Sequence, residues 1–199
     1  MTTDMSIKSD ALYCEQFPLS NKYDAGWVIK NEMGPNVLWL TEFLTRAMTL
    51  KPGMRVLDLG CGKGISSVFL AREFGVQVYA ADLWEGPDGK WAEAVSHGVE
   101  HLVTPIYADA RKLPFAKGFF DAIISVDSYF YFGTDELYLK YITQFLKPGG
   151  QIGMVVPGWM KQPVDGLPPH LTTFWEDDCW GWHTLDWWPT TGARPALLT

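Results

Sequence analysis

The chain has 199 residues, 47% of them hydrophobic and 20% charged, which is enough for one domain with a full core. Its formal net charge of -7 argues against nucleic acid as a partner, because a phosphate backbone is usually bound by a basic face. Three cysteines, Cys14, Cys61 and Cys179, are odd in number and lack metal-ligand spacing, so we expect neither a disulfide framework nor a bound metal. A polar start without a signal peptide, and no apolar run of membrane-spanning length, favour a cytoplasmic protein.

The first predicted element is a helix that Pro35 opens, with apolar residues at helical spacing from Val37 to Met48. Residues 54–64 follow, with the sequence Met-Arg-Val-Leu-Asp-Leu-Gly-Cys-Gly-Lys-Gly. An apolar run that ends in Gly-x-Gly-x-Gly and precedes the helical pattern of residues 66–74 predicts a strand, a tight turn and a helix. The glycines let a ligand approach the backbone, as in a nucleotide-binding βαβ unit.

The acid inside this stretch indicates which kind of ligand the turn binds. Asp58 stands two residues before Gly60 and would repel the pyrophosphate of a dinucleotide. It suits a cation, and S-adenosylmethionine carries an ammonium and a sulfonium but no phosphate. A nicotinamide dinucleotide site and an ordinary structural turn remain the alternatives.

Two further carboxylates follow the next two predicted strands. Residues 75–81 are strand-like and stop at Asp82, which can accept hydrogen bonds from two ribose hydroxyls. Residues 102–107 lead to Asp109, at the sheet edge where such folds bind ligands, and this carboxylate can accept the adenine amino group. The alternatives are a solvated acid at position 82 and an Asx-type turn at position 109.

Two more nearly continuous apolar runs, residues 119–126 and 151–156, predict buried parallel strands. Between them we expect an amphipathic helix that starts at residues 134–136 and ends at the Lys-Pro-Gly-Gly of residues 147–150. Its predicted apolar face carries Leu137, Tyr141, Phe145 and Leu146.

These motifs in this order resemble the class I S-adenosylmethionine-dependent methyltransferases. The resemblance rests on Val-Leu-Asp-Leu-Gly-Cys-Gly-Lys-Gly, Ala-Asp-Leu-Trp, Asp-Ala-Arg-Lys-Leu-Pro-Phe, Phe-Phe-Asp-Ala-Ile-Ile-Ser and Leu-Lys-Pro-Gly-Gly, and spans about residues 51–157. Within the superfamily the chain is similar to the small-molecule branch, which includes ubiquinone and menaquinone methyltransferases and cyclopropane fatty-acid synthase-like enzymes. The resemblance implies an α/β Rossmann-like, doubly wound, mainly parallel sheet with helices on both faces. It also implies an enzyme that uses S-adenosylmethionine to methylate a small-molecule acceptor on N, O or C.

The resemblance also assigns residues to the donor. Gly60, Cys61 and Gly62 would contact the methionine part, with Asp58 supporting its ammonium side. Asp82 would bind the ribose. The remaining implied donor contacts are Leu83 or Trp84 against adenine, Asp109 and Ala110 at its edge, and a carbonyl of Ser125 or Val126 near the ammonium.

Three segments outside the donor half are candidates for the acceptor side. Residues 1–48 are expected to form a helical lid, in which Tyr23 either reaches the methyl region or packs on the core. Asp127 and Tyr129 follow the fourth strand, where the family often places an acceptor-facing polar residue, although this aromatic run also fits a pocket wall or core layer. Residues 158–199 combine a loop with a predicted Trp-rich helix. This segment could form a pocket for an amine or supply a base, or its tryptophans could be a packing stripe on a helix that begins with a capping box. The candidate residues are Trp175, Trp180, Trp182, Trp187, Trp188, Glu176, Asp177, Asp178, His170 and His183.

One departure from the family concerns the end of the sheet. Class I methyltransferases add two strands after the last helix, and the residues after Pro157 are too few for that hairpin, so we expect it to be missing or shortened. An open edge beside exposed aromatic residues would favour a homodimer. A non-catalytic or truncated S-adenosylmethionine-binding protein of the same fold therefore remains the alternative function.

Overall fold

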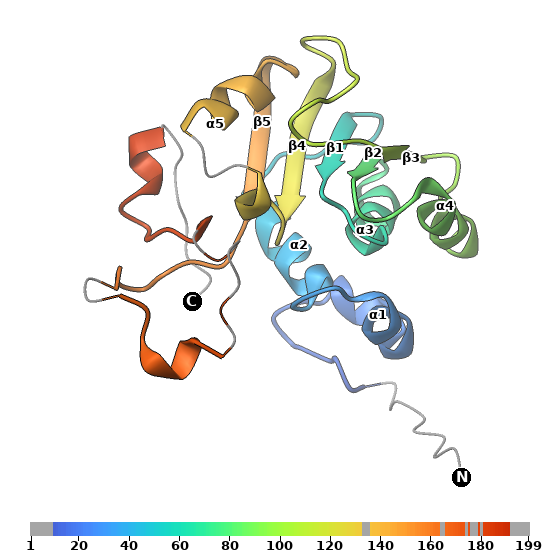
Figure 1. Ribbon diagram of the computed structural model, residues 1–199. Helices are drawn as coiled ribbons and strands as arrows, with labels where there is room; N and C mark the ends of the chain where they lie inside the picture. Colours follow the sequence, from blue (N-terminus) through green and yellow to red (C-terminus); the bar gives the residue numbers. More distant parts are fainter. Residues whose placement is uncertain are drawn as a thin grey trace.

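Five parallel strands form the centre of the fold (Figure 1). The computed structural model describes residues 10–132, 136–163, 166–173, 175, 179 and 181–191. The strand order β3-β2-β1-β4-β5 reverses between β1 and β4, which is the position where open α/β sheets bind ligands. The strands are β1 Arg55–Leu59, β2 Gln77–Asp82, β3 Val103–Tyr107, β4 Phe120–Val126 and β5 Leu146–Val155.

Helices cover both faces of this sheet, and each face has its own core. Alternate residues of β1 point to opposite faces, so Val56 packs in the core beneath α2, α3 and α4, while Leu57 packs in the core beneath α5. The predicted doubly wound α/β architecture is thereby confirmed. The helices are α1 Ala25–Asn31, α2 Val37–Thr45, α3 Ile65–Phe74, α4 Pro87–Ser96 and α5 Glu136–Thr143, with short 3-10 turns η1 Ser20–Lys22, η2 Tyr129–Tyr131, η3 Pro169–Leu171 and η5 Trp188–Thr191.

Two details of the predicted elements are wrong. Leu137 does not lie on the buried face of α5, since it is 71% exposed, and the helix buries Tyr138 and Ile142 instead. Residues 146–150 do not end a helix but form the first half of β5, where an irregularity in the pairing with β4 accommodates them. Helices α1 and α4 were not predicted.

The segment after β5 lies on the β5 side of the sheet, coloured orange to red in Figure 1. Its described residues form η3, η5 and an isolated bridge between Trp159 and Thr184, and they include neither a further strand nor the expected Trp-rich helix. The expected capping box falls partly outside the described residues, because Glu176 is not among them. In the described part of the chain, no helix is both long and apolar enough to cross a membrane.

Candidate methyl-donor and acceptor site

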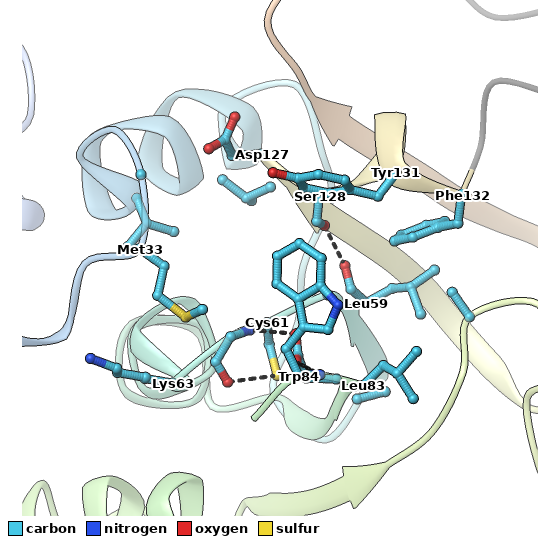
Figure 2. Close-up of a pocket in the computed structure, with 18 of the residues that line it drawn as sticks. Met33, Leu59, Cys61, Lys63, Leu83, Trp84, Asp127, Ser128, Tyr131 and Phe132 are labelled. Atoms are coloured by element: carbon cyan, nitrogen blue, oxygen red, sulfur yellow. Dashed lines mark hydrogen bonds between the residues drawn. The ribbon is translucent and has the colours of Figure 1, made fainter. Parts of the chain in front are cut away.

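A cavity of about 370 Å³ lies at the carboxyl ends of β1, β2 and β4, where the strand order reverses. This volume is within the range of small-molecule sites. Figure 2 shows its labelled side chains arranged around the space above the glycine turn. Its lining residues come from five loops and include Asn31, Glu32, Met33, Gly34, Gly60, Cys61, Gly62, Lys63, Asp82, Leu83, Trp84, Asp109, Ala110, Arg111, Val126, Asp127, Ser128, Tyr131 and Phe132.

The turn between β1 and α3 needs glycine for two physical reasons. Gly60 has φ +72° and Gly62 has φ +51°, in the left-handed region that side chains rarely adopt. A Cβ atom on Gly60 would lie 2.4 Å from the Ser128 Oγ atom, and one on Gly62 would lie 2.8 Å from the Met33 Sδ atom. The turn is held in place because the backbone N–H of Gly60 donates to the Ala81 carbonyl at 2.8 Å. At Gly60 and Gly62 the cavity is therefore lined by backbone atoms that the fold holds in place.

Asp58 lies behind this turn and does not line the cavity. Asp58 is only 1% exposed, and its Oδ2 atom accepts hydrogen bonds from the Ser66 and Ser67 hydroxyls at 2.7 and 2.6 Å. Burial raises the pKa of Asp58 to about 6, and the two hydroxyls oppose that rise. Its Oδ1 atom is buried and has no hydrogen-bond partner among the described residues. The Asp58 carboxylate can therefore attract a cation that is bound in the cavity, although it does not line the cavity itself.

The Asp82 carboxylate accepts three hydrogen bonds from the backbone of the chain itself. Its Oδ2 atom accepts from the Gly62 backbone N–H at 2.9 Å, and its Oδ1 atom accepts from the N–H groups of Trp84 and Glu85 at 2.7 and 2.8 Å. A carboxylate has about four acceptor positions, so capacity remains for a hydroxyl. Asp82 thus joins the glycine turn to the loop after β2 and still faces the cavity.

The far wall of the cavity is aromatic and amphipathic. Leu83 and the 65% exposed Trp84 line it, and the Trp84 ring lies 4.9 Å from the Tyr131 ring. Asp109 lines it as well, and its Oδ1 atom accepts from the Arg111 backbone N–H at 2.8 Å. The Asx-type turn and the cavity position therefore coexist at Asp109.

The end of β4 brings three consecutive residues to the cavity: Val126, Asp127 and Ser128. Asp127 has φ +53°, which aspartate tolerates better than most residues, and burial raises the pKa of its carboxyl to about 6. Its Oδ2 atom lies 2.6 Å from the position that a Cβ atom on Gly34 would take, so it rests against the loop between α1 and α2. Ser125 is buried behind the cavity, where its hydroxyl pairs with the Ser128 hydroxyl at 2.8 Å.

A family model described as a methyltransferase domain matches residues 57–154. Residues 57–154 are therefore similar to a methyltransferase domain. Methyltransferase GfsG of Streptomyces halstedii is 31% identical over 116 residues, which are 58% of this chain and 42% of that protein. The chain thus matches less than half of the length of this curated relative.

Solved structures agree with the methyltransferase fold. The structure of geranyl diphosphate C-methyltransferase from Streptomyces coelicolor, in complex with Mg²⁺, geranyl diphosphate and S-adenosylhomocysteine, has 26% identity and a TM-score of 0.55, over 60% of this chain and 45% of that one. An S-adenosylmethionine-dependent methyltransferase from Thiobacillus denitrificans, in complex with S-adenosylhomocysteine, has 22% identity and a TM-score of 0.67, over 90% of this chain and 71% of that one. This second likeness concerns the fold alone.

The residues of the methyltransferase cavity fit its family's donor, S-adenosylmethionine. Buried carboxylate at Asp58 and Asp82 suits a ligand with an ammonium and a sulfonium, and the side-chain-free turn leaves room for its backbone contacts. Gly60, Cys61 and Gly62 line the cavity where the methionine part is expected. The structure thus brings the predicted donor residues together, except that Asp58 and Ser125 lie behind the lining.

Two predicted catalytic tyrosines lie away from the methyltransferase cavity. Tyr23 packs between Trp27 and Phe69, and its hydroxyl donates to the Glu73 Oε1 atom at 3.3 Å. Tyr129 is only 2% exposed and packs in the core under α5. Neither residue lines the cavity, so the geometry gives neither a contact with the acceptor.

The Trp-rich segment is also separate from the cavity. Its described members pack on one another, with the Trp182 ring 6.0 Å from the Trp159 ring and His183 stacked on Trp187 at 3.6 Å. None of the described candidates from residues 158–191, including His170 and Trp188, lines the cavity. Trp180, Glu176, Asp177 and Asp178 lie outside the described residues.

Sequence reasoning missed the loop between α1 and α2 as a cavity wall. Glu32, Met33 and Gly34 line the cavity, and the Glu32 Oε1 atom is buried without a hydrogen-bond partner in the described part of the chain. Burial raises the pKa of Glu32. The Gly34-Pro35 pair marks a loop in the sequence, but only the packing of α1 and α2 shows which strand end it faces.

Proposed function

We propose that the chain is an enzyme that transfers the methyl group of S-adenosylmethionine to a small-molecule acceptor. One observation carries this proposal: a single cavity joins the glycine turn, Asp82 and Asp109 to a second set of polar groups, Asp127 and Glu32. The first set suits the donor. The second set leaves carboxylates available for another molecule, since no described residue donates a hydrogen bond to Asp127.

The proposed reaction is an in-line displacement in which the chain positions the two reactants. The bound donor supplies a methyl group on a positively charged sulfur, which keeps the bonding electron pair when the acceptor takes the methyl. Gly60 and Asp82 orient the donor, and the walls formed by Trp84 and Tyr131 limit access of water. Asp127 takes the proton that a nitrogen or oxygen nucleophile must lose.

The chemistry of Asp127 favours acceptors that bring such a proton. Its pKa of about 6 leaves the carboxylate ionised at neutral pH but still basic enough to accept a proton. The Glu32 carboxyl on the facing loop adds negative charge to the same cavity. Amines and hydroxyl compounds are therefore the acceptor classes we propose, and a carbon acceptor has less use for this pair.

A panel assay tests the function. Purified protein is incubated with S-adenosylmethionine labelled in its methyl group and with amines, phenols, fatty acids or quinols, and both S-adenosylhomocysteine and labelled product are measured. Labelled product with an amine or hydroxyl acceptor supports the proposal. Tight donor binding without product from any acceptor would instead favour the non-catalytic S-adenosylmethionine-binding protein. Absence of donor binding by calorimetry would contradict both functions.

We also propose a place and an assembly state for the enzyme. The net charge of -7 supports a small molecule rather than nucleic acid as partner, and we propose that it acts in the cytoplasm. β5 forms one edge of the sheet, and no described strand pairs with its outer side, which supports a homodimer through this edge. Light scattering coupled to gel filtration tests the homodimer, and a monomer at all concentrations would contradict it.

A further inference from the structure

Lys90 is a buried, charged residue near the donor turn that has no role in the proposed methyl transfer. It lies on α4 with only 1% of its surface exposed, although lysine is almost never fully buried without a partner. Its stem packs on the last glycine of the turn, since the Lys90 Cγ atom is 3.4 Å from where a Cβ atom on Gly64 would be. Lys90 thus reaches the donor turn from its outer side.

The ammonium group of Lys90 is anchored on the neighbouring donor loop. Its Nζ atom donates to the Glu85 carbonyl at 2.8 Å, while the N–H of the same Glu85 residue donates to Asp82. One side chain therefore braces both the glycine turn and the loop that carries Leu83 and Trp84. Neither Lys90 nor the Glu85 carbonyl lines the cavity, so this effect on the donor is indirect.

The charge of Lys90 also has a specific place in the site. Asp58 and Asp82 are two buried carboxylates, and Lys90 is the buried cation whose charge lowers the pKa of Asp58 against the effect of burial. The other groups that face Asp58 are the Ser66 and Ser67 hydroxyls and the Cys61 thiol, whose own pKa is raised by burial. Without Lys90, the described residues would offer no buried positive charge to oppose the repulsion between Asp58 and Asp82.

We propose that Lys90 is a positioning residue of the donor site, which braces the Asp82 loop against the glycine turn and supplies a buried positive charge to the carboxylates of this site, so that S-adenosylmethionine binds at neutral pH. This inference rests on the proposed donor site. Because ionised Asp58 attracts the cationic donor, affinity falls as the pH drops through the pKa of Asp58. Removal of the Lys90 charge moves that fall to higher pH.

The test measures S-adenosylmethionine affinity by calorimetry from about pH 5.5 to about pH 8.5 for wild type, Lys90→Gln and Lys90→Met. Glutamine removes the charge and keeps a donor, and methionine removes both. We expect both variants to shift the midpoint upward by about one pH unit, which gives about fivefold weaker binding near pH 6, more at lower pH, and a smaller loss near pH 8.5. Methionine should add a loss at all pH values, because the Glu85 carbonyl loses its partner. Each comparison is a ratio to wild type at the same pH, which cancels titration of the donor's own amine.

Two controls make the outcomes distinct. Lys140→Gln changes an exposed lysine on α5 and should leave the profile unchanged. In an Asp58→Asn background, Lys90→Gln should no longer shift the pH midpoint. A loss that is equal at all pH values in Lys90→Gln, or unchanged affinity, would overturn the inference while leaving the proposed function intact. If Lys90→Met does not fold, Lys90→Gln alone decides, and a wild type that binds no S-adenosylmethionine overturns both proposals.

Discussion

The two halves of the cavity differ in how their carboxylates are satisfied. On the donor half, Asp82 accepts three backbone N–H bonds, and Asp58 accepts two hydroxyl bonds at its Oδ2 atom while its buried Oδ1 atom has no described partner. On the acceptor half, no described residue donates a hydrogen bond to the Asp127 carboxylate, and the Glu32 Oε1 atom is buried without a described partner. The donor half is therefore shaped in advance by the chain itself, whereas the acceptor half has polar groups that a ligand would satisfy.

This difference implies different results from mutation. A change on the donor half removes structural hydrogen bonds, so it should alter folding stability and donor binding together. A change on the acceptor half removes a group that the fold does not use, so it should alter turnover with little effect on stability.

The largest effect is expected from Asp82→Ala. It leaves three backbone N–H groups without their acceptor and removes the ribose contact, so we expect about 100-fold weaker S-adenosylmethionine binding and a free energy of unfolding lower by about 3 kcal/mol. Calorimetry and urea unfolding measure the two quantities. Asp109→Ala is the matched control, because the Asp109 carboxylate accepts only one backbone bond from the described residues at a similar sheet edge, and it should lose about tenfold in affinity. Equal losses in the two variants would contradict the special position of Asp82.

Asp127→Asn should lower kcat about 100-fold and leave S-adenosylmethionine affinity within about twofold, since the amide keeps the shape but cannot take the proton. The pH profile gives a second readout. The ionised form is active, so wild-type kcat at saturating donor should rise with pH through about 6 and then level off. Asp127→Asn should lack this rise. If the rise persists in the variant, the base is another group.

Much of the donor half could be predicted because its signals are local. The apolar run, the glycines and the following helical pattern specify β1, the turn and α3 within residues 55–74. Asp82 and Asp109 could be found because parallel strands end at a common sheet edge. The position of each carboxylate then follows from where its strand stops.

Residues that depend on packing between distant elements could not be found in this way. Lys90 in the sequence Gly-Lys-Trp-Ala-Glu looks like a solvated lysine, and only the contact of α4 with Gly64 buries it. Ser128 reaches the turn because β4 lies beside β1, so that its hydroxyl donates to the Leu59 carbonyl at 2.9 Å. No pattern along the chain specifies these contacts.

The third prediction separates steric contact from backbone conformation in the glycine turn. Gly60→Ala places a Cβ atom 2.4 Å from the Ser128 Oγ atom at a φ of +72°, whereas Gly53→Ala has a φ of +80° with nothing within 4 Å. We expect Gly53→Ala to lower the free energy of unfolding by about 1 kcal/mol, the cost of the left-handed backbone alone. Gly60→Ala should lower it by about 2 to 3 kcal/mol, because the overlap adds to that cost. Urea unfolding measures both, and equal losses would mean that the turn relaxes away from Ser128.

The smallest effect is expected from Tyr129→Phe, two residues from Asp127. Both residues follow β4, but η2 turns the Tyr129 side chain into the core under α5, where its ring lies 5.6 Å from the Tyr138 ring. Phenylalanine keeps this ring packing, so kcat and donor affinity should stay within about twofold of wild type, and the free energy of unfolding within about 1 kcal/mol. A steady-state assay beside Asp127→Asn measures the contrast. A loss of kcat in Tyr129→Phe as large as that in Asp127→Asn would mean that the tyrosine hydroxyl takes part in turnover, and the boundary between cavity and core would have to include it.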